Sequence, residues 1–155
     1  MTEQLIEQLG LLGVFLAGAT PFLEALIVVP VAIVLGLDPV ITTVVAVAGN
    51  AVTIGLFALS SRTIMGWIQA RRHRRGLSRY SASMQRGMDI FEKYGLWSMA
   101  VLGPLVIGTQ LGAAIAVSLG VPTARASVIV IVATALWAIL AAIVTLVIIG
   151  GAGQW

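Results

Sequence analysis

A single carboxylate stands inside a long apolar run near the start of the chain. The stretch TPFLEALIVVP, residues 20–30, contains Glu24, and no other residue between Gly10 and Leu37 is ionisable. A charge is costly at membrane depth, so an ionisable residue in a membrane segment is by default a functional candidate. Glu24 is therefore our first candidate for a site that binds a proton, a cation or part of a substrate.

Further polar side chains could join this acid if their segments meet it. Thr20 precedes Glu24 by four residues, and the stretch GPLVIGTQ interrupts a second apolar run with Gly108, Thr109 and Gln110. Irregular backbone at membrane depth must be buried in protein or line a polar cavity. We expect the two interruptions to meet there and to supply a mid-membrane cavity.

Side chains suited to catalysis or metal binding are scarce. The chain has no cysteine and one histidine, His73, which lies in a basic segment. Asp89 and Glu92 fall in a predicted surface helix, so no catalytic pair of acids is apparent. We expect no enzyme activity, no metal site and no cofactor.

Composition predicts the elements that would position these residues. Of 155 residues, 59% are hydrophobic and only 10% are charged, whereas soluble domains have about 25% charged residues. Four stretches exceed the ~20 residues that cross a bilayer. They are Gly10–Leu37, Pro39–Ser61, Gly95–Gly120 and Ala126–Gly153. We expect an all-α, multi-pass protein of the cell membrane that forms a single membrane domain, residues 1–155.

Basic residues orient this domain. Of nine Lys and Arg residues, all but Arg125 lie between Arg62 and Lys93, which places residues 62–94 in the cytoplasm. Because this block adjoins apolar spans, we expect it to contact anionic lipid headgroups rather than nucleic acid. Within it, Tyr80–Tyr94 has an apolar stripe at helical spacing, typical of an amphipathic helix at the membrane surface.

The two halves of the chain have similar patterns. In residues 12–43 and again in 94–126, an early glycine is followed by a proline, a second glycine and another proline. Such repeats with interrupted apolar segments are typical of transporters. We expect one repeat over about 10–61 and an inverted one over about 95–153, joined by the cytoplasmic segment.

The first apolar run is too long for one straight span. A helix over residues 10–37 would be roughly 42 Å long, against a core of ~30 Å. Pro21 and Pro30 disfavour an unbroken helix, and Pro104 and Gly108 take their place in the second half. Each repeat would then be a re-entrant helical hairpin plus a transmembrane helix, with the breaks over residues 19–24 and around 103–110. The alternative is four kinked full spans.

These residues carry a family resemblance. The pattern PFLE before VVPVAIVLGL and AGN, and the segment FEKYGLWSMAVLGPLVIGTQLGAAIAVSLGVP, resemble the small multidrug export family and, more broadly, DedA-like membrane proteins. The resemblance covers residues 10–150 and implies a transporter built from two inverted repeats. It also implies that Glu24 is the acid of the first hairpin and that Asn50 is the polar residue of the next helix.

The resemblance leaves the substrate open. The family tends to have an arginine two residues after the acid, where this chain has Leu26. Arg62 or Arg125 could take its place as a phosphate contact. The DedA-like relatives imply movement of a phosphorylated polyprenyl lipid, which we expect here because the chain offers few aromatic residues for a drug pocket.

Two alternatives accompany the lipid transporter. The first is a proton-coupled small multidrug exporter, and the second is a membrane scaffold subunit that transports nothing. The small residues of Gly108–Gly112 also favour close helix packing, either within one chain or in a homo-oligomer.

Overall fold

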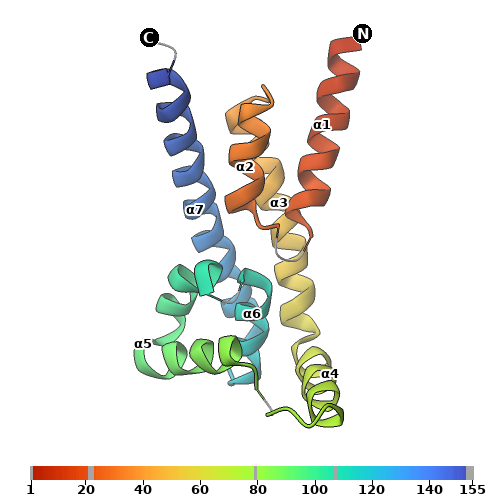
Figure 1. Ribbon diagram of the computed structural model, residues 1–155, viewed down its shortest axis with the longest axis vertical. Coiled ribbons are helices and arrows are strands. Elements are labelled where there is room, and N and C mark those ends of the chain that lie inside the picture. Colours follow the sequence, from red (N-terminus) through yellow and green to blue (C-terminus); the bar gives the residue numbers. More distant parts are fainter. Residues whose placement is uncertain (1, 21–22, 79, 107, 153–155) are drawn as a thin grey trace. The chain divides into compact units, whose positions relative to one another are not determined.

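The computed structural model describes residues 2–20, 23–78, 80–106 and 108–152, and in this part of the chain all regular structure is helical. The seven helices are shown in Figure 1. Their bounds are α1 Thr2–Gly18, α2 Ala25–Val34, α3 Pro39–Leu59, α4 Ser61–Arg74, α5 Ala82–Val106, α6 Thr109–Ser118 and α7 Thr123–Ala152.

Two of the described helices are long and apolar enough to cross a membrane. They are Pro39–Leu59, which is α3, and Thr123–Gly151, which is nearly all of α7. The other two apolar runs are each divided, into α1 and α2 in the first half and into the second part of α5 and α6 in the second half. In the described residues the chain is thus all-helical, and two of the four predicted crossings are interrupted.

The first interruption separates two helices that pack against each other. α1 ends at Gly18 and α2 begins at Ala25, which matches the break predicted over residues 19–24. Pro21 lies outside the described residues. Pro30, also predicted as a break, is instead inside α2. A proline removes one helical hydrogen bond, and membrane helices tolerate this loss, so Pro30 does not end the helix.

The second interruption lies directly before α6. Gly108 precedes α6 with φ of 85°, in the left-handed region that glycine adopts without steric cost. Pro104 was also predicted to break the chain here, but it lies inside α5, close to its end. α5 is itself interrupted at Gly95, with φ of 75°, where the amphipathic helix ends and the second repeat was predicted to begin.

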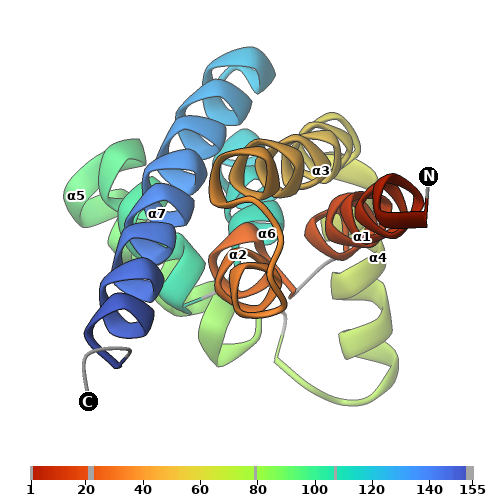
Figure 2. The same cartoon turned by 90° about the horizontal axis from the view of Figure 1, so that it is seen from above.

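The chain divides into two compact units. Unit 1 comprises Met1–Val52 and Thr134–Trp155, and unit 2 comprises Thr53–Ala133. In unit 1, α2 lies between α1 and the C-terminal part of α7 (Figure 2). The unit's core joins Val14 of α1, Ala25 and Val29 of α2, Ala46 of α3 and Ala138 of α7.

In unit 1 we can follow the direction of each helix and the contact between α1 and α3. α1 and α2 run in opposite directions, and the Thr2 end of α1 and the Ala152 end of α7 lie at the same end of the unit (Figure 1). α1 approaches α3 closely through two glycines. A Cβ on Gly18 would be 2.5 Å from the carbonyl oxygen of Ala46, and one on Gly49 would overlap the carbonyl oxygen of Phe15.

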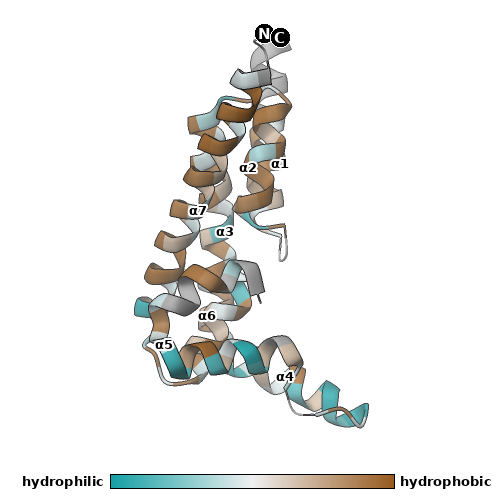
Figure 3. Ribbon diagram, turned by 60° about the vertical axis from the view of Figure 1, so that its left-hand side comes forward, coloured by the Kyte–Doolittle hydropathy of each residue, from teal (hydrophilic) through white to brown (hydrophobic). Residues whose placement is uncertain are grey.

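In unit 2, α6 is the central helix. It packs against α4 and α5, and its residues Ala113 and Ile115 contribute to two core clusters that also contain residues of α3, α4, α5 and α7. The basic segment that separates the two halves is largely the helix α4, and His73 is exposed in its last turn. α4 ends in polar residues (Figure 3).

Candidate functional site

Glu24 occupies the start of α2 in unit 1. Its backbone carbonyl accepts hydrogen bonds from Ile27 N (2.9 Å) and Val28 N (3.1 Å), so it is the N-cap residue of that helix. Its side chain makes no capping bond and is only 5% exposed. By contrast Asp38, Asp89 and Glu92 are exposed. The predicted acid is therefore a buried carboxylate at the point where the first apolar run breaks.

Thr20 closes the end of α1. Its hydroxyl donates to the carbonyl oxygen of Leu16 at 2.8 Å, and its own carbonyl accepts from Leu23 N at 3.2 Å. The side chain is exposed. The hydroxyl proton of Thr20 is thus already used in shaping the turn between α1 and α2, and its oxygen remains able to accept a hydrogen bond.

Asn50 lies in α3 at the level of this turn. The preceding residue, Gly49, is so close to α1 that an added Cβ would lie 3.1 Å from the backbone nitrogen of Ala19. Asn50 itself is fully buried. The glycine of the AGN triplet is therefore explained by the close approach of α1, which leaves no room for a side chain. The asparagine that follows it is buried in unit 1.

The polar residues of the second interruption form a cluster in unit 2. Thr109 and Gln110 begin α6 and are 1% and 3% exposed. The hydroxyl of Thr109 donates to Gln110 Oε1 at 3.2 Å, and Gln110 Nε2 donates to Thr53 Oγ1 at 3.5 Å. Buried polar groups need such partners, and Thr53 is one that the sequence did not reveal as a site residue.

The two predicted arginines have a different setting. Arg62 in α4 and Arg125 in α7 are both exposed residues of unit 2. Thr20, Glu24 and Asn50 belong to unit 1, whereas Thr109, Gln110 and the two arginines belong to unit 2. Among the described residues, no three His, Cys, Asp or Glu side chains gather as a metal site would require.

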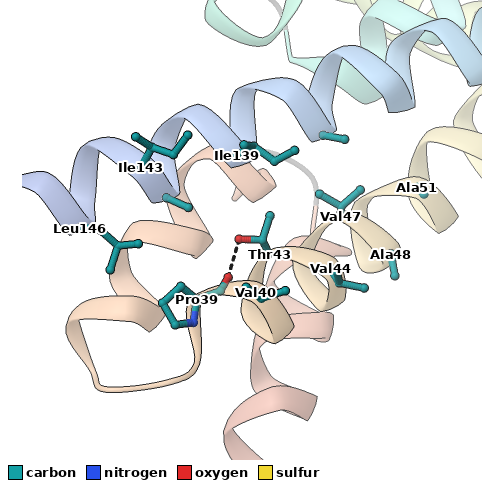
Figure 4. Close-up of a pocket in the computed structure, with 12 residues that line it drawn as sticks. Pro39, Val40, Thr43, Val44, Val47, Ala48, Ala51, Ile139, Ile143 and Leu146 are labelled. Atoms are coloured by element: carbon teal, nitrogen blue, oxygen red, sulfur yellow. Dashed lines mark hydrogen bonds between the residues drawn. The ribbon is translucent and has the colours of Figure 1, made fainter.

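An apolar groove in unit 1 was not foreseen from the sequence. It has a volume of about 550 Å³ and lies between α3 and α7, lined by residues such as Val44, Val47 and Ile139 (Figure 4). Its polar side chain, Thr43, donates to the carbonyl oxygen of Pro39 at 2.7 Å. With that proton already bound, the groove suits an apolar occupant.

The comparisons with known proteins identify a matching family. A family described as "Putative small multi-drug export protein" matches residues 24–140, which is most of the chain. This match begins at Glu24 and includes both α3 and α6. No curated protein and no solved structure is detectably similar to the chain.

Proposed function

The chain belongs to the family of small multi-drug export proteins, and we propose that it exports small cationic amphiphiles across the membrane in exchange for protons. The observation that carries this proposal is Glu24, a buried carboxylate at the break between α1 and α2. A carboxylate in this setting can bind either a proton or a cation, and an exchanger needs a group that binds each in turn.

The groove of unit 1 supports an amphiphilic substrate. Its walls are apolar side chains of α3 and α7, and apolar walls are what the apolar part of a drug-like molecule requires. Ala142 lines the groove and also belongs to the core cluster that contains Ala25, the residue after Glu24. The groove and the helix that follows Glu24 thus both contribute to one core cluster.

We propose that each half of the chain is a re-entrant hairpin followed by a spanning helix, in an inverted repeat. Two local similarities support this. α2 and α6 are both ten residues long, and each is followed by Leu-Gly and then by a spanning helix. Both glycines have positive φ, 89° at Gly36 and 99° at Gly120.

The side of the membrane on which residues lie tests this arrangement. Single cysteines replace Thr2, Gly151 or Arg74 in a chain that has no cysteine of its own, and an impermeant reagent is applied to intact cells. With hairpins, Thr2→Cys and Gly151→Cys react from outside and Arg74→Cys does not. With four full spans all three positions would share the cytoplasmic side, which would refute the hairpins.

Transport itself is tested in vesicles loaded with a cationic dye. An inward proton gradient is applied to the reconstituted wild type and to Glu24→Gln, with Glu92→Gln as matched control because Glu92 is exposed on α5. We expect Glu24→Gln to abolish dye efflux and Glu92→Gln to preserve it. A folded Glu24→Gln protein that exports dye at the wild-type rate would remove Glu24 from the mechanism.

Movement of a phosphorylated polyprenyl lipid is the second candidate. It is favoured by the exposed arginines of unit 2, which suit a phosphate group, and is disfavoured by Leu26, an uncharged residue two positions after the acid. Vesicles with a polyprenyl phosphate confined to one leaflet distinguish the two. Lipid movement without dye efflux would replace the exporter with a lipid transporter.

A further inference from the structure

A pocket in unit 2 combines three arginines with an apolar floor. It has a volume of about 310 Å³ and lies where the end of α4 faces the start of α5. Arg71, Arg72 and Arg75 line it together with Ile68, Met84 and Leu111. Apart from Leu111, its lining residues belong to the segment 62–94 that was predicted to be cytoplasmic, and the residues proposed for export do not contribute to it.

Ile68, Arg71 and Arg72 lie on one face of α4, and Arg75 follows at its C-cap position. Ile68, Arg71, Arg72 and Arg75 are spaced at intervals of three, four and seven residues from the first, which is the spacing of neighbours on a helical surface. Met84 of α5 is 2% exposed and belongs to the core cluster that contains Ile115 of α6. The floor is therefore part of the packed core, and the arginines form the rim above it.

Hydrogen bonds hold one rim arginine in place. Arg72 Nε donates to the carbonyl oxygen of Ser78 at 2.7 Å, and its Nη2 donates to Ser78 Oγ at 3.4 Å. Ser78 Oγ in turn donates to the carbonyl oxygen of Tyr80 at 2.8 Å. Arg71 lies 5.3 Å from the ring centre of Trp67, within the range of a cation–π contact. Contacts within the protein thus hold at least two of the pocket's arginine side chains in place before any ligand binds.

The charges of this pocket are not balanced by the residues that line it. None of these is acidic, and the described acids of unit 2, Asp89 and Glu92, lie outside it. Like charges at neighbouring helical positions repel each other. A bound anion would relieve this repulsion, and guanidinium groups bind phosphate with two parallel hydrogen bonds.

The position of the pocket selects the source of the anion. α4 begins two residues after α3, a membrane span, ends, and Trp67 is 61% exposed, as expected of an indole at the headgroup level. Basic clusters directly beyond a span attract anionic lipids. We propose that this pocket binds the phosphate of an anionic phospholipid, with the start of an acyl chain on its apolar floor.

Quenching of Trp67 by brominated lipids tests this site. In a chain where Trp97, Trp137 and Trp155 are phenylalanine, Trp67 is the sole tryptophan. The protein is reconstituted into vesicles that contain either brominated phosphatidylglycerol or brominated phosphatidylcholine at equal mole fraction. We expect the anionic lipid to quench Trp67 more strongly at low mole fraction.

Two matched double variants distinguish a specific binding site from general electrostatic attraction by the basic segment. Arg71→Gln with Arg75→Gln removes two rim charges and keeps the hydrogen bonds of Arg72, while Arg74→Gln with Arg86→Gln removes two exposed charges outside the pocket. We expect the first pair to lower the preference for the anionic lipid by about ten-fold or more and the second to change it little. An equal loss in both pairs, or no loss in the first, would overturn the site.

Inorganic phosphate separates a lipid from a free anion. Added in excess to the same vesicles, and compared with chloride at equal ionic strength, it should leave the quenching by phosphatidylglycerol unchanged. If phosphate displaces the lipid while chloride does not, the pocket takes free phosphate and the lipid proposal fails.

Discussion

The helices α2 and α6 are alike in backbone and different in chemistry. Each has ten residues, and each ends in the same hydrogen-bond pattern. At the first, Gly36 N donates to Ile33 O and Leu37 N to Ala32 O, and at the second Gly120 N donates to Val117 O and Val121 N to Ala116 O. These are Schellman-type ends that use a left-handed glycine.

Their first residues differ in the functional groups that they carry. α2 starts at a buried carboxylate, Glu24, whereas α6 starts at Gly108, and the polar groups that follow it are the hydroxyl of Thr109 and the amide of Gln110. The start of α2 therefore carries an ionisable group, and the start of α6 carries neutral hydrogen-bonding groups. This difference teaches that both halves have a break before a ten-residue helix, and that of these two helices only α2 starts at an ionisable residue.

The surfaces of the two helices differ as well. α2 leaves Ile27, Val31 and Val34 exposed, whereas in α6 every residue from Gly112 to Ala116 is buried. Small residues allow helices to approach closely in membranes. α6 is therefore enclosed by its unit, while α2 presents an apolar side to its surroundings.

The largest expected loss of stability comes from a change in the first half of the chain. Gly49→Val places a side chain on the backbone of Phe15, in the contact that holds α1 against α3. Because backbone atoms must move, we expect a loss of roughly 3 kcal/mol in stability, measured by denaturation in detergent. Gly55→Val is the control. Gly55 lies on the same helix as Gly49, but an added Cβ there would have no atom within 4 Å. Equal losses in both variants would contradict the close approach.

An intermediate effect tests whether the two helix ends are equivalent. Gly36→Ala and Gly120→Ala each force a side chain into the left-handed region without a clash, so each should cost about 1 kcal/mol of stability. Gly13→Ala, in the regular part of α1, should instead be neutral or stabilising. A loss at one end only would show that the ends are not equivalent.

The smallest expected effect concerns the neutral cluster of the second half. Gln110→Met and Thr53→Val, alone and together, form a double-mutant cycle across the 3.5 Å hydrogen bond. At that length the bond is weak, and we expect a coupling of about 0.5 kcal/mol in the stability of the protein. A coupling indistinguishable from zero would show that the cluster is held by its other contacts.

Local features of this protein could be predicted from the sequence. Hydropathy indicated the spans α3 and α7, the charge pattern separated the halves, and Glu24 stood out because it is the lone ionisable residue of its run. The break over residues 19–24 was also predictable, because one unbroken helix over residues 10–37 would be longer than the bilayer core is thick. Each of these follows from residues that are close together in the chain.

Prolines were poor guides to where helices end. Pro30 and Pro104 both lie inside helices, since a helix can lose one hydrogen bond when its neighbours in the fold still favour it. The residue directly before α6 is instead Gly108, whose φ of 85° is readily available to glycine. The sequence shows that both kinds of residue are present but not which of them the packed chain uses.

Tertiary structure decided which distant residues meet. The approach of Gly49 to Phe15, the pairing of Gln110 with Thr53, and the closure of a pocket under Arg71 and Arg75 each join residues of different helices. Periodicity predicts which face of a helix a residue occupies, but the partner of that face depends on how the helices pack. For that physical reason the acid could be predicted from the sequence, and the surroundings in which it and the arginines lie could not.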